Sequence, residues 1–256
     1  ALDLPEWDPT LCIQCGKCAM VCPHAAIRAK VVDEAALAGA PEGFKSADGK
    51  PPFKGKKFTL QIAVEDCTGC GLCSKVCPEL PNTGKTLTMV HYDQDKLRKP
   101  GEKNWEFFLG LPETELTGVP LTAKTSQLKR PLFEFSGACA GCGETPYIKL
   151  VTQLYGDRMM IANATGCSSI YGGSAPTVPY SVNKKGFGPA WANSLFEDNA
   201  EFGFGMNLAT TQRRAKLADT VEKLIAVEYC DANLKAAGKE WLDNMDDAEG
   251  SRKAAD

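Results

Sequence analysis

The sequence of 256 residues has very little histidine, no long apolar run and no excess of positive charge. With only His24 and His91, it has almost no material for zinc sites of mixed cysteine and histidine ligation. No stretch approaches the roughly 20 apolar residues that span a bilayer, which argues against a membrane span. The net charge of −3 argues against a nucleic-acid-binding surface, which would be basic.

The N-terminus also lacks the features of an exported protein. Residues 1–7 carry neither a basic n-region nor an apolar core, so the sequence predicts no secretory signal. The chain starts without a methionine, as if cut from something longer. We therefore expect its cysteines to be reduced in the cytoplasm and available for metal ligation, rather than paired in disulfides.

Cysteine is the abundant residue: there are twelve, and eleven of them fall into three compact groups. The first two groups repeat the pattern C-x-x-C-x-x-C-x-x-x-C-P of bacterial ferredoxins, in which the fourth cysteine of each run ligates the other cluster. The pattern predicts two [4Fe–4S] clusters with crossed ligation. One is held by Cys12, Cys15, Cys18 and Cys77, and the other by Cys67, Cys70, Cys73 and Cys22.

The spacing of each run has a physical reason. Three thiolates on one tight loop can hold three irons of a cubane, and the fourth cysteine is expected to open a helix that points it toward the other cluster. Gly16, Gly69 and Gly71 would let backbone N–H groups approach the cluster sulfurs. The alternative is a pair of zinc ribbons, which would need neither the third cysteine nor the Cys-Pro ending. Because each cluster needs both runs, the two halves should fold as one unit.

Composition divides the chain into a ferredoxin domain at 1–115, a linker at 116–130 and a second domain at 131–256. Within the first domain, about residues 38–57 are rich in Gly, Pro and Lys and are expected to form an inserted surface loop. Residues 58–64 then alternate like a strand. The loop contains four lysines: Lys50, Lys54, Lys56 and Lys57. They either form a basic patch that binds an acidic electron acceptor or are simply solvated surface charges.

The second domain is expected to begin with a strand at 131–135, a helix capped by Thr145 with Pro146 at its first position, and a buried strand at 159–162. Strand, helix and strand in this order predict an α/β sheet, in which ligands bind beyond the carboxyl ends of the strands. The third cysteine group would then lie on two adjacent loops at that edge. By spacing alone it suits a catalytic zinc site, a redox pair or three ligands of a further cluster; its members are Cys139, Cys142 and Cys167.

Three features near the C-terminus have interpretations that involve no cofactor. Cys230 follows an apolar run and is expected on an amphipathic helix as a small buried hydrophobe, although its role is open. A helical stripe that includes Leu217 and Leu224 is expected to form core or partner contacts. Residues 246–256 are charged and small, which favours a frayed or disordered tail.

Three segments carry a resemblance to a known family: CAGCGETPY at 139–147, ATGCSSIYGG at 164–173 and GPAWANSLFEDNAEFGFG at 188–205. They resemble pyruvate:ferredoxin (flavodoxin) oxidoreductases, in which a ferredoxin module directly precedes a thiamine-diphosphate-binding α/β domain. The resemblance implies an α+β internal fragment containing the two-cluster ferredoxin domain and the first part of that α/β domain. It implies that Cys139, Cys142 and Cys167 hold a third [4Fe–4S] cluster. Glu144 and Cys167 would line the thiamine pocket, flanked by Gly166 and Ser168.

The resemblance implies the electron-exit part of an enzyme that converts pyruvate and coenzyme A, with oxidised ferredoxin or flavodoxin, to acetyl-CoA and CO₂. The complete enzyme is expected to be a homodimer that uses thiamine diphosphate and Mg²⁺. The family's Gly-Asp-Gly motif and the fourth ligand of the third cluster are absent here, so most thiamine ligands would lie outside this chain. The resemblance assigns no catalytic residue, and the fragment alone should be inactive. The alternative is a non-catalytic polyferredoxin with a scaffold domain.

Overall fold

The computed structural model describes the whole chain except residues 82–83, 92, 174–177 and 256. Its contacts divide the chain into two compact units, Ala1–Asn193 and Ser194–Asp256. Strands and helices mix in the first unit, which confirms the predicted α+β class. The contacts thus separate at a point beyond the predicted linker, and the division at 116–130 stays a prediction. Within the described residues, no helix is long and apolar enough to cross a membrane.

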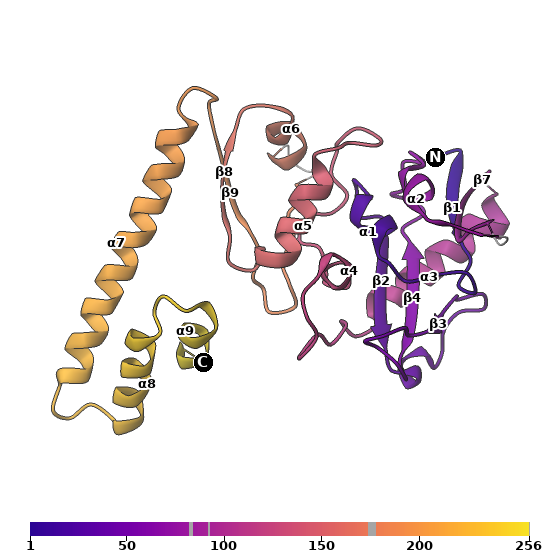
Figure 1. The fold of residues 1–256 in the computed structure, drawn as a ribbon. Helices are drawn as coiled ribbons and strands as arrows, with labels where there is room; N and C mark the ends of the chain where they lie inside the picture. The colour runs from indigo at the N-terminus through magenta and orange to yellow at the C-terminus, as the bar shows by residue number, and fades with distance from the viewer. Residues whose placement is uncertain (82–83, 92, 174–177, 256) are drawn as a thin grey trace. The chain divides into compact units, whose positions relative to one another are not determined.

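A short antiparallel sheet forms the centre of the first unit. β2 (Ile27–Val32) pairs with β4 (Lys57–Ile62), and β3 (Ala47–Asp48) pairs with the other edge of β4. The strand predicted at 58–64 is therefore confirmed. Figure 1 shows α1 (Lys17–Val21) at one end of this sheet, where it packs against α2 (Leu72–Val76).

β2 is buried on both faces, although its sequence alternates between apolar and charged residues. Ile27, Ala29 and Val31 belong to the main core on the cysteine side of the sheet. The alternate residues Arg28 and Lys30 contact aromatic rings on the opposite side. Alternation normally indicates a half-exposed strand, and here later segments of the chain cover the second face.

The N-terminal strand closes over the first cysteine run. β1 (Asp3–Trp7) pairs antiparallel with β7 (Leu87–His91), so that Trp7 lies opposite Leu87. The Trp7 indole packs edge-on against Phe58 of β4 at 5.9 Å between ring centroids. A further antiparallel pair of short strands, β5 (Glu79–Leu80) and β6 (Gly84–Lys85), follows the second cysteine run.

The predicted surface loop is anchored rather than free. Phe53 is buried, and Phe44 packs edge-on against Phe107. Lys57 pairs with Asp48 at 2.8 Å, which favours the interpretation of these lysines as solvated surface charge over a docking patch. The loop is preceded by η1 (Glu34–Leu37).

A helical segment covers the second face of β2. It consists of η2 (Gln94–Arg98) and α3 (Lys99–Gly110). Phe108 is 1% exposed and stacks on Trp105 with ring centroids 5.4 Å apart. Apolar burial of this helix therefore fixes the outer layer of the ferredoxin domain.

The region after α3 differs from the prediction. The expected linker contains α4 (Ala123–Ser126), whose Thr125 and Ser126 are buried. The strand expected at 131–135 is wrong: only an isolated bridge joins Phe133 to Tyr180, and Phe135 adopts a φ of +53°, which ends an extended strand.

The helix and strand that follow are confirmed, but not their burial. α5 (Thr145–Tyr155) has proline in its first turn, as predicted, although Glu144 and not Thr145 is its N-cap. β8 (Met160–Ala164) pairs with β9 (Ala190–Ser194) in a two-stranded sheet. Met160 is 53% exposed, so the expectation of a buried strand is wrong in this chain.

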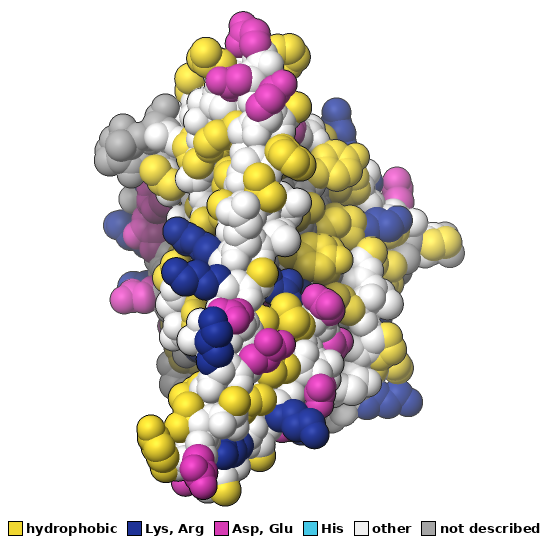
Figure 2. Space-filling model, turned by 90° about the vertical axis from the view of Figure 1, so that its left-hand side faces the viewer, with side chains coloured by type: hydrophobic (Ala, Val, Ile, Leu, Met, Phe, Trp, Pro, Cys, Tyr) yellow, Lys and Arg dark blue, Asp and Glu magenta, His cyan; other side chains and the backbone are white. Residues whose placement is uncertain are grey.

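The second unit consists of helices α7 (Asn199–Ala226), α8 (Ala232–Asp243) and α9 (Ala248–Ala255). The expectation of a disordered tail is therefore wrong. Cys230 lies half-buried in the turn between α7 and α8, not on a helix. None of the described α7 residues is buried, and Figure 2, which faces this helix, shows hydrophobic side chains among charged ones on the surface.

Candidate metal centres

Two cavities in the first unit are each lined by four cysteine thiols. The lining of one includes three cysteines of the first run and the last of the second: Cys12, Cys15, Cys18 and Cys77. The lining of the other includes the reciprocal set: Cys67, Cys70, Cys73 and Cys22. The fold thus groups the thiols in the crossed arrangement expected from the repeat, and their ligation of iron stays a prediction.

Local backbone geometry places these thiols. Each run bends at a glycine with positive φ, Gly16 at +75° and Gly71 at +76°, which caps the short helix that follows. The third cysteine lies inside that helix. The fourth, Cys22 or Cys77, ends the helix in an extended conformation, so the expectation that it opens a helix is wrong. The following proline explains this, because it disfavours helical geometry in the residue before it.

Gln14 holds the first cysteine loop in place. Its backbone N–H donates to Cys12 Sγ at 3.4 Å, in a residue whose φ is +57°. Its buried side-chain amide donates to Asp48 O and accepts from the backbone N–H of Lys50, both at 2.8 Å. The inserted loop therefore supports the cysteine loop, and no sequence pattern indicated this role.

The thiols crowd together in poorly solvated surroundings. Burial raises the pKa of Cys12 and Cys67, and it raises the pKa of Cys18 and Cys73 to about 12, with neighbouring thiols adding to the effect. Thiols in such a place favour the protonated form until a metal stabilises the thiolates, so loading would release protons.

The surroundings of the first cavity suit a sulfur-rich cluster. The buried indole Nε1 of Trp7 has no conventional hydrogen-bond partner in the described structure, yet it lies close enough to Cys12 to lower the pKa of that thiol. N–H groups directed at cluster sulfurs tune iron–sulfur centres. Among the described residues, no three His, Cys, Asp or Glu side chains converge on a point suited to a single ion. The four thiols that line each cavity are the donor set that a cubane needs.

The third cysteine group packs against the second cavity. Gly141, between Cys139 and Cys142, has a φ of +76°, and a β-carbon there would lie 3.8 Å from Cys70 Cβ. Cys142 N donates to Cys139 O at 3.1 Å, which closes the turn. The loop therefore passes so close to Cys70, which lines one of the four-thiol cavities, that a side chain at Gly141 would touch it.

Glu144 links this loop to α6 (Cys167–Gly173). Burial, followed by the nearby Glu144 carboxylate, raises the pKa of Tyr171 on α6 and raises the pKa of Tyr180 to about 12. Both tyrosines were missed from the sequence. Cys167 begins α6 and is exposed, as is Cys139, so the three thiols of this group are not enclosed by this chain.

The two flanking residues form the entry to α6. Gly166 N donates to Ser169 Oγ at 3.0 Å, and Ser168 is half-buried beside it. These contacts stabilise the turn that presents Cys167 to solvent. The expected position of Gly166 and Ser168 beside a thiamine pocket stays a prediction.

α5 buries its polar side and exposes its apolar side. Thr145, Lys149 and Gln153 are among its buried residues, while Val151 and Tyr155 are 41% and 52% exposed. The Gln153 side chain donates to a backbone carbonyl of the preceding segment at 2.8 Å. This orientation is opposite to the one that hydrophobic periodicity predicts.

Lys149 joins α5 to the ferredoxin domain. Its Nζ donates to Met20 O at 3.0 Å, to Cys22 O at 3.4 Å and to Ala19 O. These carbonyls lie at the C-terminal end of α1, where main-chain acceptors lack helical partners. Burial lowers the pKa of Lys149 to about 8. A lysine on a helix surface is usually solvated, and nothing in the sequence pointed to this position.

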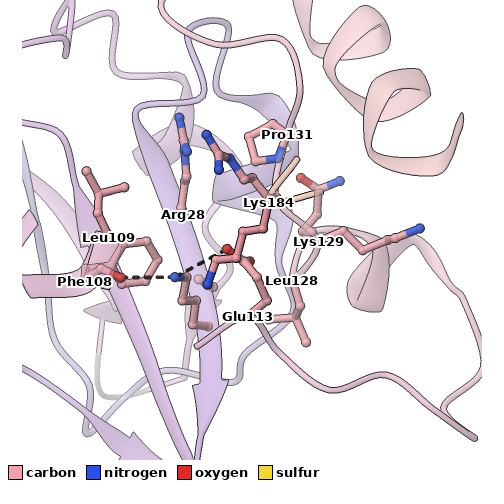
Figure 3. A pocket seen from close by; sticks show the side chains of 12 residues that line it. Arg28, Phe108, Leu109, Glu113, Leu128, Lys129, Pro131 and Lys184 are labelled. Atoms are coloured by element: carbon pink, nitrogen blue, oxygen red, sulfur yellow. Dashed lines mark hydrogen bonds and ion pairs between the residues drawn. The ribbon is translucent and has the colours of Figure 1, made fainter. Parts of the chain in front are cut away.

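A basic pocket lies on the other side of the sheet, between β2 and the segment before α5 (Figure 3). Lys30 Nζ donates to Phe108 O at 3.1 Å and to Leu111 O at 2.7 Å, and Arg28 pairs with Glu134. Burial lowers the pKa of Lys30, and the nearby Glu113 opposes this. Arg28 and Lys30 are thus bound within the fold, and the Arg28–Glu134 pair attaches the segment before α5 to β2.

Two protein-family descriptions match parts of the chain. Residues 11–79 match the 4Fe-4S dicluster domain, which covers both ferredoxin-type cysteine runs. Residues 213–256 match the insertion domain of pyruvate-ferredoxin oxidoreductase and include most of the helical second unit.

The chain is also similar to longer proteins over nearly all of its length. It is 54% identical over 258 residues to the pyruvate:ferredoxin oxidoreductase of Moorella thermoacetica, covering 100% of this chain and 21% of that protein. It is 51% identical to the pyruvate-flavodoxin oxidoreductase of Nostoc, covering 95% and 21%. The mitochondrial pyruvate dehydrogenase [NADP(+)] of Euglena gracilis is 44% identical, with 99% and 14% covered. The chain spans about one fifth of the length of the first two.

Proposed function

We propose that this chain, a segment of the pyruvate:ferredoxin (flavodoxin) oxidoreductase family, is the electron-exit part of a 2-oxoacid oxidoreductase. The overall reaction would convert pyruvate and coenzyme A to acetyl-CoA, CO₂, one proton and two electrons. The electrons would leave singly through iron–sulfur clusters to ferredoxin or flavodoxin. Cluster-ligating thiols are best preserved in the reducing cytoplasm.

The crossed pair of four-thiol cavities is the observation that carries this proposal. Each cavity takes three cysteines from one loop and one from the other, which suits two [4Fe–4S] clusters in adjacent positions. The apolar core around them would exclude water, and short backbone contacts such as Gln14 N to Cys12 Sγ would adjust the potential.

The packing of the third cysteine group supports a direction for electron flow. Gly141 lies against Cys70, so a cluster held partly by Cys139, Cys142 and Cys167 would be nearest to the cluster of the second cavity. Electrons would then pass to the cluster of the first cavity and on to the external carrier. The fourth ligand of the third cluster would come from outside this chain.

Thiamine diphosphate with Mg²⁺, when bound in the complete enzyme, would supply the decarboxylation chemistry. Glu144 and Cys167 would form one side of its pocket, with Gly166 and Ser168 flanking the contact. Glu144 is exposed in this chain and lies near two poorly solvated tyrosines, so its carboxylate is open to a group bound against this face. The remaining domains, and a second copy of the enzyme in a homodimer, would complete the site.

Iron and acid-labile sulfide analysis of anaerobically purified protein tests the proposal. We expect about eight irons per chain in the ferredoxin domain, and poor occupancy of the third site. Two irons or fewer, accompanied by stoichiometric zinc, would refute it. The chain alone should not oxidise pyruvate, and measurable turnover without further domains would contradict the assignment of this chain as the exit part only.

A further inference from the structure

Three Lys or Arg side chains are buried among the described residues: Arg28, Lys30 and Lys149. The first two have carboxylate partners, Glu134 for Arg28 and Glu113 at 3.8 Å for Lys30. Lys149 is the most buried of the three, at 2% exposure, and no Asp or Glu of the described chain forms an ion pair with it. Since a buried charge without a counter-charge is costly, an anion beside this ammonium would stabilise it, and the protein's carboxylates do not supply one.

The position of Lys149 indicates where that anion lies. Its Nζ donates to Cys22 O, and the sulfurs of Cys22 and Cys18 are the groups near it that become negative once they are deprotonated to ligate a metal. Cys22 lines the second four-thiol cavity, and Cys18 lines the first. The ammonium thus lies beside both cavities, where carbonyls at the end of α1 fix its place.

We propose that Lys149 is the buried counter-ion of the two ferredoxin-type clusters and raises the reduction potential of the cluster held by Cys22 above the value it would otherwise have. This inference rests on the proposed function, because it needs cubanes in the cavities. A cubane with four thiolates is anionic, and one-electron reduction adds one further negative charge without making or breaking a bond. A fixed cation beside it stabilises the reduced form more than the oxidised form.

The location of Lys149 gives this charge a use in the proposed reaction. It lies on α5, whose N-terminus follows Cys142 and Glu144, and it acts on the cavity against which that loop packs. A higher potential at this cluster would favour transfer from the third cluster into the ferredoxin domain. Lys149 is therefore a positioning residue, which acts through the clusters and touches no substrate.

The test compares reduction potentials in the iron-loaded chain. Lys149→Gln and Lys149→Met remove the charge, Lys149→Arg retains it, and Lys75→Gln is the matched control. Lys75 is exposed and two residues from Cys73 and Cys77, so solvent screens its charge. Each protein is titrated with dithionite under argon, and the reduced clusters are followed by electron paramagnetic resonance.

In the two neutral variants we expect the equilibrium constant for reduction of one cluster to fall about tenfold, which for one electron is about 59 mV. Lys149→Arg and Lys75→Gln should remain near the parent value. Unchanged potentials in a neutral variant that retains eight irons would overturn the inference and leave the proposed function intact. Zinc in place of iron in the parent chain would instead overturn the proposed function.

The number of irons bound per chain is the second readout if the neutral variants do not incorporate clusters. Failure of both neutral variants together with full loading of Lys149→Arg would support the counter-ion role, since only the charge separates them. Failure of all three Lys149 variants would overturn it, because the lysine would then act through its shape and its contacts with the end of α1.

Discussion

Replacing Cys22 by alanine is expected to remove the cluster whose other three ligands belong to the second cysteine run. Cys22 lies in the first run, but it lines the cavity of Cys67, Cys70 and Cys73. A cubane contains four irons, so the single variant should retain about four of about eight irons per chain. Cys67→Ala should remove the same cluster and leave the same number.

Double variants make this prediction decisive. Cys22→Ala with Cys67→Ala affects one cavity twice, and about four irons should remain. Cys22→Ala with Cys15→Ala affects both cavities, although both residues belong to the first run, and no cluster should remain. Iron and sulfide analysis, with electron paramagnetic resonance of the reduced protein, measures the outcome. Four irons remaining in the Cys15 and Cys22 double variant would refute the crossed arrangement.

Three further predictions concern the structure around the clusters. Gly69→Ala should lower the melting temperature of the protein more than Gly71→Ala. Both glycines have a positive φ, where a side chain costs about 1–2 kcal/mol. Only at Gly69 would the β-carbon also lie 2.9 Å from a backbone oxygen of the N-terminal strand. Phe108→Ala should lower the free energy of unfolding by about 3–5 kcal/mol because Phe108 is 1% exposed, whereas Leu109→Ala, at 51% exposure, should cost little; equal losses in denaturant titrations would contradict this. Arg28→Met should lower the free energy of unfolding by about 3 kcal/mol, the low end of the range for breaking a buried pair, because Glu134 keeps a looser pair with Arg130 at 3.8 Å. A neutral result would show that the Arg28 pair adds no net stability.

Among the features of the sequence, the cysteine spacing predicted the largest part of the candidate site. It predicted two interlocked four-thiol sites because a cubane imposes fixed distances between its ligands, and a short loop can meet them with only a few spacings. Local signals also predicted α5 from Thr145–Pro146 and the strand of β4 from its alternation. These features depend on residues that are near in sequence, so the sequence alone is sufficient to indicate them.

Only the tertiary structure decided which faces are covered. The polar side of α5 is buried because Lys149 reaches backbone carbonyls of the ferredoxin domain and Gln153 reaches one of the segment before α5, and no periodicity reveals such acceptors. The expected strand at 131–135 is reduced to one bridge, because the chain turns away at Phe135, whose N–H donates to His24 O at 3.0 Å beside the first cysteine run. Hydrogen bonds between segments more than 100 residues apart depend on how the chain folds back on itself. The amino-acid sequence does not show which distant segments will meet.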